Sequence, residues 1–439
     1  MRPMNLRRLT SMLITAIALL SASTAMAQLR IEINRGVSEA VPVAVVPFGY
    51  DGPGQAPIDA AGVIAGDLER SGRFAPLPGD DMISRPTSGR EVNFTDWRLL
   101  KTDFLVIGSL LDQGADRYLI RFQVFDVFRG AQVLGFQIPA SADSLRAASH
   151  RAADMIFEKL TGTPGAFSTR IAYVSVTRQG EKDLYRLFVA DADGANPRMI
   201  SESSQPLMSP GWSPDGRRLA YVSFEGSRSA IFVQELATGK RTEVSARPGI
   251  NGAPAFSPDG RWLALTLSGQ DGNLDIHVLN PATGQLRRLT KNPAIDTEAA
   301  WSADGKAIYF TSDRSGGPQV YMVPVDGSGG ARRITFEGRY NARPRVTPDG
   351  ASLAVVHNDQ GNYRIALVDL ETKSTHILTD GRQDESPSIA PNGSMIIYAT
   401  RLAGRGTLAA VSTDGRISQT LAAAAGDVRE PVWSPYPTY

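Results

Sequence analysis

Between residues 170 and 434, short apolar runs alternate with turn sequences rich in glycine, proline and aspartate. In one unit, polar residues separate the runs 218–222 and 230–233, and the turn at residues 237–240 leads into a further run that ends at Val244. Short apolar runs that are bounded by turn residues are typical of β-strands. The pattern therefore predicts an all-β region over most of the second half of the chain.

A tight-turn phrase recurs six times in this region. Its proline presets φ, its aspartate can accept hydrogen bonds from nearby backbone amides, and its glycine accepts a positive φ. The fourth positions of successive phrases are 44, 45, 45, 43 and 44 residues apart. A repeat of this length with four strands per unit predicts the blades of a β-propeller. The phrases are Trp212-Ser213-Pro214-Asp215-Gly216, Phe256-Ser257-Pro258-Asp259-Gly260, Trp301-Ser302-Ala303-Asp304-Gly305, Val346-Thr347-Pro348-Asp349-Gly350, Ile389-Ala390-Pro391-Asn392-Gly393 and Trp433-Ser434-Pro435-Tyr436.

The two ends of the repeat region complement each other. Residues 170–174 match a second strand but have no inner strand before them, whereas residues 428–434 match an inner strand with no blade after them. If the two segments pair, they close the ring and remove the exposed edges of an open array. We therefore expect six blades, one of them assembled from both ends of residues 163–439.

Residues 28–162 lack the repeat and predict a separate domain. A buried strand is expected at residues 41–46, a helix at 58–70, further strands at 104–108 and 118–124, and an amphipathic helix at 143–160. The Gly-Thr-Pro-Gly stretch at residues 162–165 is the expected linker. The fold class predicted for the chain is an N-terminal α/β domain plus a C-terminal all-β six-bladed β-propeller.

Residues 1–27 predict an export signal. Three arginines precede the apolar run 9–20, and the small-residue triplet Ala25-Met26-Ala27 follows it. A membrane anchor is the rival interpretation, but a spanning helix needs about 20 strongly apolar residues, and this run is shorter. The chain has no cysteine, so neither a disulfide nor an acylated cysteine is expected. We predict cleavage before Gln28, a periplasmic location and no direct membrane insertion.

Charge excludes one large class of partner. Removal of the predicted signal leaves 43 Lys and Arg against 45 Asp and Glu, and no block of like charge stands out. Nucleic-acid binding is therefore not expected.

Candidate catalytic and metal-binding residues were weighed against structural roles. The repeated aspartates Asp215, Asp259, Asp304 and Asp349 each belong to the turn of a different blade, which favours turn formation over acid–base or metal chemistry. None of the four histidines is spaced from another as a ligand pair would be, so surface or strand packing is expected for them. The tryptophans of the repeat could form a sugar-stacking cage, but their shared position favours core packing. No cofactor or metal is predicted.

A serine hydrolase of the prolyl-peptidase kind is the enzyme alternative, because such enzymes carry propellers with similar phrases. The sequence has no Gly-x-Ser-x-Gly motif and ends three residues after the last phrase, which leaves no hydrolase domain. We therefore expect no catalytic activity.

The loops that lead into the inner strands should lie together on one face of the propeller. Small, amide and acidic residues dominate these loops, which suits a protein-docking face that accepts hydrogen bonds, although solvated loops without a partner would look the same. The candidate face consists of Ile250, Asn251, Ala253, Asp296, Thr297, Glu298, Asn341, Arg343, Asp384 and Glu385.

A second candidate site is the mature N-terminus. Leucine and isoleucine alternate with polar residues there, as in an edge strand. The segment is either the first strand of the α/β domain or a strand that pairs with the sheet of a partner. It consists of Gln28, Leu29, Arg30, Ile31, Glu32, Ile33 and Asn34.

The complete arrangement resembles the TolB family, the periplasmic propeller proteins of the Tol-Pal envelope system. The most specific stretches are residues 251–260, Thr311-Ser312-Asp313-Arg314 followed by Pro318-Gln319-Val320-Tyr321, and residues 390–393. The resemblance implies a monomeric adaptor whose propeller face binds the lipoprotein Pal and whose N-terminal strand binds TolA. It further implies a role in outer-membrane constriction at division and in envelope integrity.

One residue departs from the family pattern: Ile250 stands where members often carry a polar or ring-bearing residue. The alternative to an adaptor is a periplasmic receptor that binds a glycan or small ligand in the propeller funnel. A soluble ligand would then raise the melting temperature without any protein partner.

Overall fold

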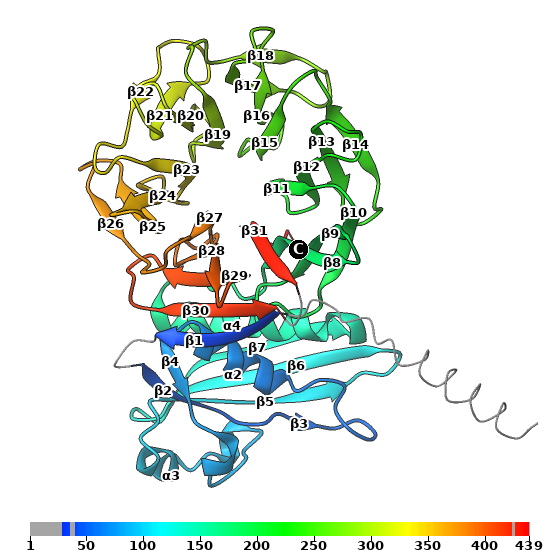
Figure 1. The fold of residues 1–439 in the computed structure, drawn as a ribbon. Helices are drawn as coiled ribbons and strands as arrows, with labels where there is room; N and C mark the ends of the chain where they lie inside the picture. Colours follow the sequence, from blue (N-terminus) through cyan, green and yellow to red (C-terminus); the bar gives the residue numbers. More distant parts are fainter. Residues whose placement is uncertain (1–28, 36–39, 424–425, 439) are drawn as a thin grey trace, which may run out of the picture.

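The computed structural model describes residues 29–35, 40–423 and 426–438, so the predicted signal lies outside the described residues. The chain forms two domains that lie side by side, a ring of blades and a smaller α/β domain against its rim (Figure 1). This is the predicted fold class, an α/β domain followed by a six-bladed propeller.

The α/β domain is built on a mixed sheet. Its strand order is β4-β2-β5-β6-β7, with β3 also beside β5. β2 pairs in parallel with β4 and β5, whereas β5, β6 and β7 pair antiparallel. Its elements are β2 (Val41–Val45), β3 (Gly49–Tyr50), α2 (Ala60–Arg70), β4 (Phe74–Pro76), η1 (Gly79–Asp81), η2 (Gly89–Glu91), α3 (Phe94–Leu99), β5 (Phe104–Asp112), β6 (Arg117–Asp126), β7 (Ala131–Ser141), η3 (Ala142–Ser144) and α4 (Leu145–Thr161).

Helices cover both faces of this sheet. On one face, Ile64 of α2 and Ile156 of α4 share a buried cluster with Phe122 of β6. On the other face, the fully buried Trp97 of α3 belongs to a second cluster. α4 ends where Gly162 takes a φ of 76°, a conformation that glycine adopts without steric cost. The sequence therefore located both long helices, and α4 directs the chain into the propeller.

Each propeller blade is an antiparallel sheet with its first strand at the centre of the ring (Figure 1). We number the blades one to six along the chain. Blade one is β31 (Asp427–Trp433), β8 (Arg170–Gln179), β9 (Lys182–Asp191) and β10 (Arg198–Ser203); blade two is β11 (Leu207–Trp212), β12 (Arg218–Ser223), β13 (Ala230–Glu235) and β14 (Arg241–Ser245); blade three is β15 (Asn251–Phe256), β16 (Leu263–Ser268), β17 (Leu274–Leu279) and β18 (Leu286–Arg288). Blade four is β19 (Asp296–Trp301), β20 (Ala307–Ser312), β21 (Gln319–Pro324) and β22 (Arg332–Arg333); blade five is β23 (Asn341–Val346), β24 (Ser352–Asp359), β25 (Asn362–Asp369) and β26 (Thr375–Ile377); blade six is β27 (Glu385–Ile389), β28 (Met395–Leu402), β29 (Arg405–Ser412) and β30 (Ser418–Ala423).

The ring closes by pairing its two ends. β31 runs antiparallel to β8, with Val428 opposite Ser175 and Trp433 opposite Ile171. Beyond the strands, the backbone N–H of Ser434 donates to the carbonyl of Arg170 over 2.8 Å. The predicted interlock of blade one from both ends of the propeller is confirmed.

The repeated phrase forms the same turn in blade after blade. In blade two, the Ser213 hydroxyl donates to Asp215 Oδ1 over 2.5 Å, and that oxygen also accepts from the Arg217 backbone N–H over 3.0 Å. Gly216 has a φ of 66°. Trp212 packs in the core between blades, and its indole Nε1 donates to the carbonyl of Val432 over 3.1 Å. These aspartates and tryptophans are thus structural parts of the repeat.

Candidate docking face and N-terminal strand

The inner strands of the six blades surround the central channel of the ring. Each of them contains a β-bulge, which changes the direction of the side chains that follow. In each bulge a non-glycine residue takes a left-handed conformation, with φ between 47° and 58°. Each lies six residues before the fourth position of its turn phrase. We call these residues the bulge ring: Ser209, Ala253, Glu298, Arg343, Ser386 and Glu430.

Arg343 connects several members of the bulge ring across the channel. Its Nε donates to Glu298 Oε1 over 2.6 Å, and one terminal nitrogen lies 3.3 Å from Glu430 Oε1. The other terminal nitrogen donates to the Ser386 hydroxyl. The charges of Glu430 and Glu298 raise the pKa of Arg343, so the guanidinium stays charged. One side chain of blade five therefore links blades four, six and one.

Arg343 lies at the edge of a polar basin of about 1260 Å³, including the open solvent at its mouth. Glu298 and Glu385, both predicted face residues, also line the basin. Tyr340 and Tyr363 form an edge-to-face pair there, with ring centroids 5.1 Å apart. Sequence reasoning missed Tyr363, whose only signal is an aromatic side chain directly after the β24–β25 turn. The arrangement offers carboxylates, guanidiniums and aromatic edges to a protein surface.

Four predicted face residues lie beneath the face rather than on it. Asn251, Asp296, Asn341 and Asp384 each lie eight residues before the fourth position of a turn phrase, and all are buried. Asp296 receives both 2.8 Å hydrogen bonds of one Arg314 nitrogen, and Asn341 Oδ1 lies 2.9 Å from His357 Nδ1. Burial raises the pKa of Asp384, although two threonine hydroxyls donate to it. These buried side chains hold the beginnings of the inner strands in place. We had expected them to lie on the surface, in direct contact with a partner.

The remaining predicted face residues are accessible. Ile250 is 45% exposed. Glu385 is exposed, and Ala253, Thr297, Glu298 and Arg343 are partly exposed. The face therefore consists of an apolar residue, small residues and a charged network around the channel mouth.

The N-terminal strand β1 (Leu29–Arg35) belongs to the propeller sheet rather than to the α/β sheet. It runs antiparallel to β30 as the fifth strand of blade six, with Ile31 opposite Leu421 and Ile33 opposite Gln419 (Figure 1). The interpretation of this segment as the first strand of the α/β domain is therefore wrong. β1 instead pairs with the backbone of β30, which would otherwise be the outer edge of blade six. Gln28 lies outside the described residues.

A buried charged cluster joins the two domains beneath β1. His150 Nδ1 of α4 lies 2.7 Å from Asp67 Oδ2 of α2, and His150 Nε2 lies 3.8 Å from Asp193 Oδ2 in the β9–β10 turn. Ligand atoms of these three residues lie within 4.8 Å of one another, which would suit a metal ion. However, Arg70 pairs with Asp67, and Arg146 pairs with Asp193. The cluster thus already contains its cations. His150 is a buried helix residue, not the surface or strand position expected from sequence.

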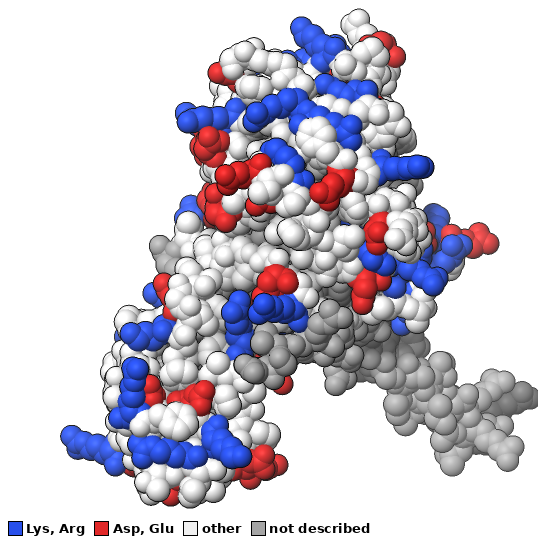
Figure 2. Space-filling view, turned by 90° about the vertical axis from the view of Figure 1, so that its left-hand side faces the viewer, with Lys and Arg blue, Asp and Glu red and all other residues white. Residues whose placement is uncertain are grey.

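Basic and acidic side chains are interspersed over both domains on the face that Figure 2 shows. Among the described residues, no helix is long and apolar enough to cross a membrane.

A six-bladed propeller with an α/β domain against its rim, and with the N-terminal strand added to blade six, defines the class of protein: a two-domain β-propeller protein. Residues 29–133 match the model of the TolB amino-terminal domain, and residues 157–437 match that of the TolB β-propeller domain. The chain belongs to the TolB family and is a component of the Tol-Pal system.

Individual relatives agree over almost the whole chain. It is 54% identical to the Tol-Pal system protein TolB of Thioalkalivibrio sulfidiphilus, over 94% of this chain and 95% of the relative. It is 49% identical to TolB of Xanthomonas euvesicatoria, over 96% of this chain and 97% of the relative. The crystal structure of TolB from Acinetobacter baumannii is 40% identical, with a TM-score of 0.86, over 93% of this chain and all of that one.

Proposed function

We propose that this chain is a non-catalytic periplasmic adaptor, exported with a cleaved signal, that binds the lipoprotein Pal through the propeller face and TolA through its N-terminal strand. The adaptor would support outer-membrane invagination at division and outer-membrane integrity. The observation that supports the proposal is the pairing of β1 with β30, which makes the N-terminal segment an added edge strand of the propeller rather than a part of the α/β sheet.

The two sites support a switch between partners. β1 is the edge strand of blade six, and only one of its two edges pairs with β30. A partner that adds a strand to the other edge leaves β1 in place, whereas a partner that pairs with the edge facing β30 competes with β30; the switch requires the second mode. If Pal binding favours one position of β1, then Pal and TolA affinities are coupled, and the coupling is reciprocal.

Calorimetric titration of residues 28–439 with soluble Pal from the same organism tests the Pal site. We expect saturable one-to-one binding, and a changed affinity for a chain that begins at Val41. Ala253→Arg, on the bulge ring, should weaken binding at least about tenfold by crowding the face. Ala237→Arg places the same side chain on an exposed turn of blade two and should leave affinity unchanged.

Absence of heat at several temperatures, with both proteins folded, would overturn the Pal assignment. A rise in melting temperature with soluble glycan alone would then favour the receptor alternative. A strand peptide of residues 28–34 that fails to bind TolA would overturn the assignment of the second site without affecting the first.

A further inference from the structure

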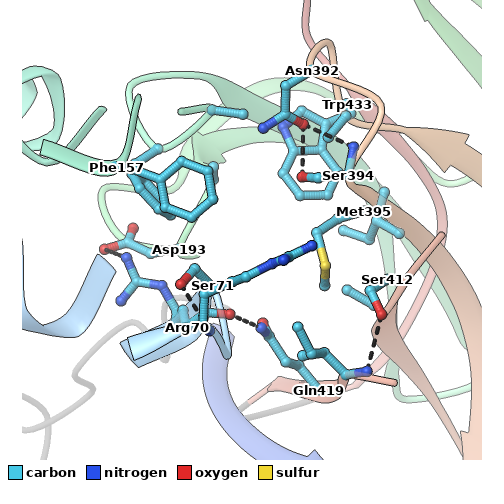
Figure 3. Close-up of a pocket in the computed structure, with 18 of the residues that line it drawn as sticks. Arg70, Ser71, Phe157, Asp193, Asn392, Ser394, Met395, Ser412, Gln419 and Trp433 are labelled. Carbon is cyan, nitrogen blue, oxygen red and sulfur yellow. Dashed lines mark hydrogen bonds and ion pairs between the residues drawn. The ribbon is translucent and has the colours of Figure 1, made fainter. Parts of the chain in front are cut away.

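Side chains of both domains line the space beneath blade six (Figure 3). Phe157 of α4 lies on one side of it and Met395 of blade six on the other, and Gln419 Nε2 donates to the carbonyl of Arg70. These side chains leave only about 80 Å³ between the domains. Small-molecule sites measure roughly 300–1,000 Å³, so the junction is too closely packed to hold such a ligand.

A larger space lies at the second mouth of the propeller channel. It holds about 460 Å³ and is lined by residues of the turn phrases and of the inner strands just before them. Each inner strand runs from its bulge toward its turn phrase, so this mouth is at the end of the channel opposite the docking face. The space has the size of a small-molecule site.

One residue of each blade contributes to a ring around this space. Each lies four residues before the fourth position of a turn phrase, two residues beyond the bulge ring. Blade five contributes an arginine, whereas the other blades contribute glycine, alanine, valine or serine. Of the described residues that line the space, Arg345 is the only one with a charge. We call these residues the second ring: Gly211, Ala255, Ala300, Arg345, Ser388 and Val432.

Arg345 has no carboxylate partner in the described part of the chain. One terminal nitrogen donates to the carbonyl of Pro344 over 2.9 Å, and no carboxylate oxygen lies within ion-pair distance. The charges of Glu298 and Glu430 do reach it, but both glutamates pair with Arg343. Desolvation and the charge of Arg343 lower the pKa of Arg345 against the opposing effect of the two glutamates. The protein thus leaves the charge of this guanidinium only partly compensated.

Ser388 supplies a second donor at the neighbouring ring position, in blade six. It is 5% exposed, and its hydroxyl oxygen accepts from the backbone N–H of Trp433 over 2.9 Å. A hydroxyl that accepts one hydrogen bond still carries a proton that it can donate. The second ring therefore combines one cation and one hydroxyl with small apolar side chains.

We propose that the second mouth of the channel binds a singly charged carboxylate on a small apolar body, with the carboxylate paired to Arg345. A guanidinium binds a carboxylate through two parallel hydrogen bonds, which an amide or an alcohol does not accept in the same way. A single cation balances a single negative charge, so a carboxylate fits this wall better than a phosphate group, which carries about −1.5 to −2 charges at pH 7. A small organic acid and the last residue of a peptide both carry such a carboxylate, and the test separates these two sources. The site lies away from the docking face and does not depend on the proposed partners.

The test titrates residues 28–439 with isovalerate and with a blocked tripeptide that ends in leucine, each beside its neutral amide. We expect one acid molecule per chain and shifts of the indole NMR signals of Trp212, Trp301 and Trp433, which line the space. The indole signal of Trp97, in the core of the α/β domain, should stay unshifted. Binding of the peptide acid alone would identify a chain end as the source, and binding of isovalerate would identify a free small acid.

Arg345→Gln should weaken acid binding at least about tenfold, the worth of a hydrogen bond to a charged group, and leave amide binding unchanged. Arg261→Gln is the matched control, because Arg261 is an exposed arginine directly after the turn phrase of blade three, at the same mouth. This control should alter neither affinity. Ala255→Leu adds bulk to the second ring and should weaken acid and amide alike.

The melting temperature separates a binding role of Arg345 from a structural one. Since its charge is only partly compensated, Arg345→Gln should not lower the melting temperature, and a marked fall would overturn the proposal. The proposal is also overturned if neither acid binds at millimolar concentration, if the indole signals around the mouth do not shift, or if Arg345→Gln and Arg261→Gln bind the acids equally well.

Discussion

Two charged networks hold this molecule together, and they respond differently to their surroundings. In the channel, Arg343 links Glu298 and Glu430 on the bulge ring. Between the domains, Arg70, Arg146 and His150 face Asp67, Asp191 and Asp193. The first network is built around a guanidinium whose pKa the charges of Glu430 and Glu298 raise, whereas the second contains a histidine. The domain junction should therefore be the more sensitive of the two to pH near neutral.

The largest effect is expected from breaking the channel network. Arg343→Met removes the guanidinium and leaves Glu298 and Glu430 without their common partner. We expect a loss of about 3 kcal/mol in the free energy of unfolding, since removing one partner of a largely buried pair strands the other charges. Chemical denaturation followed by tryptophan fluorescence measures this loss. The double variant Glu298→Gln with Arg343→Met should recover part of this loss. If Arg343→Met alone costs no more stability than the loss of a surface ion pair, the linking role of Arg343 is contradicted.

Breaking the interdomain network should cost somewhat less. Asp67 is fully buried and pairs with both Arg70 and His150, so Asp67→Asn should destabilise the domain junction by about 2 kcal/mol. The matched control is Asp126→Asn, whose partner Arg129 is 82% exposed and whose ion pair should contribute little. Limited proteolysis at the linker, at residues 162–165, reports the junction directly. Equal cleavage of the two variants would show that Asp67 does not hold the domains together.

How far the sequence predicted these features depends on the range of the interactions. The blades follow from local turn chemistry, because an aspartate or asparagine followed by glycine forms the same turn in five of the six phrases. The bulge ring also recurs at a fixed offset, but its residue types differ, so only the backbone reveals it. Asn251 and Asp296 looked like solvated loop residues, because their buried partners belong to other segments. The partners of β1 and His150 come from distant parts of the chain, which no local pattern identifies.

The pH dependence of the junction follows from His150. Burial opposes protonation of His150, but the hydrogen bond and charge of Asp67, together with Asp193 and Asp191, outweigh it and raise the pKa of the imidazole. A raised pKa in the folded state means that the stabilisation is complete below about pH 6.5 and is lost as pH rises through the folded pKa. Arg70 and Arg146 also face this cluster.

We expect linker proteolysis to accelerate as pH rises through the raised pKa of His150, by less than Asp67→Asn causes. His150→Gln should remove this dependence. Asp154 adds a second step at lower pH, because burial raises its pKa to about 6. The stability of the junction therefore falls as pH rises from about 4 to about 6, where the buried carboxyl loses its proton. Asp154→Asn should remove only that lower step. If the unaltered protein, His150→Gln and Asp154→Asn show the same dependence of proteolysis on pH, the assignment of the two steps to His150 and Asp154 is contradicted.

The smallest effect should come from the turn aspartates. The hydrogen bonds from the Ser257 hydroxyl and the Arg261 N–H lower the pKa of Asp259 to about 2. Its contribution is therefore present above about pH 4 and is lost as pH falls toward 2. Asp259→Asn should cost less than about 1 kcal/mol, since the side chain is 43% exposed and solvent screens it. Urea denaturation at pH 7 and pH 3 measures this, and a larger cost at pH 3 than at pH 7 would show that turn geometry, not charge, determines the role of Asp259.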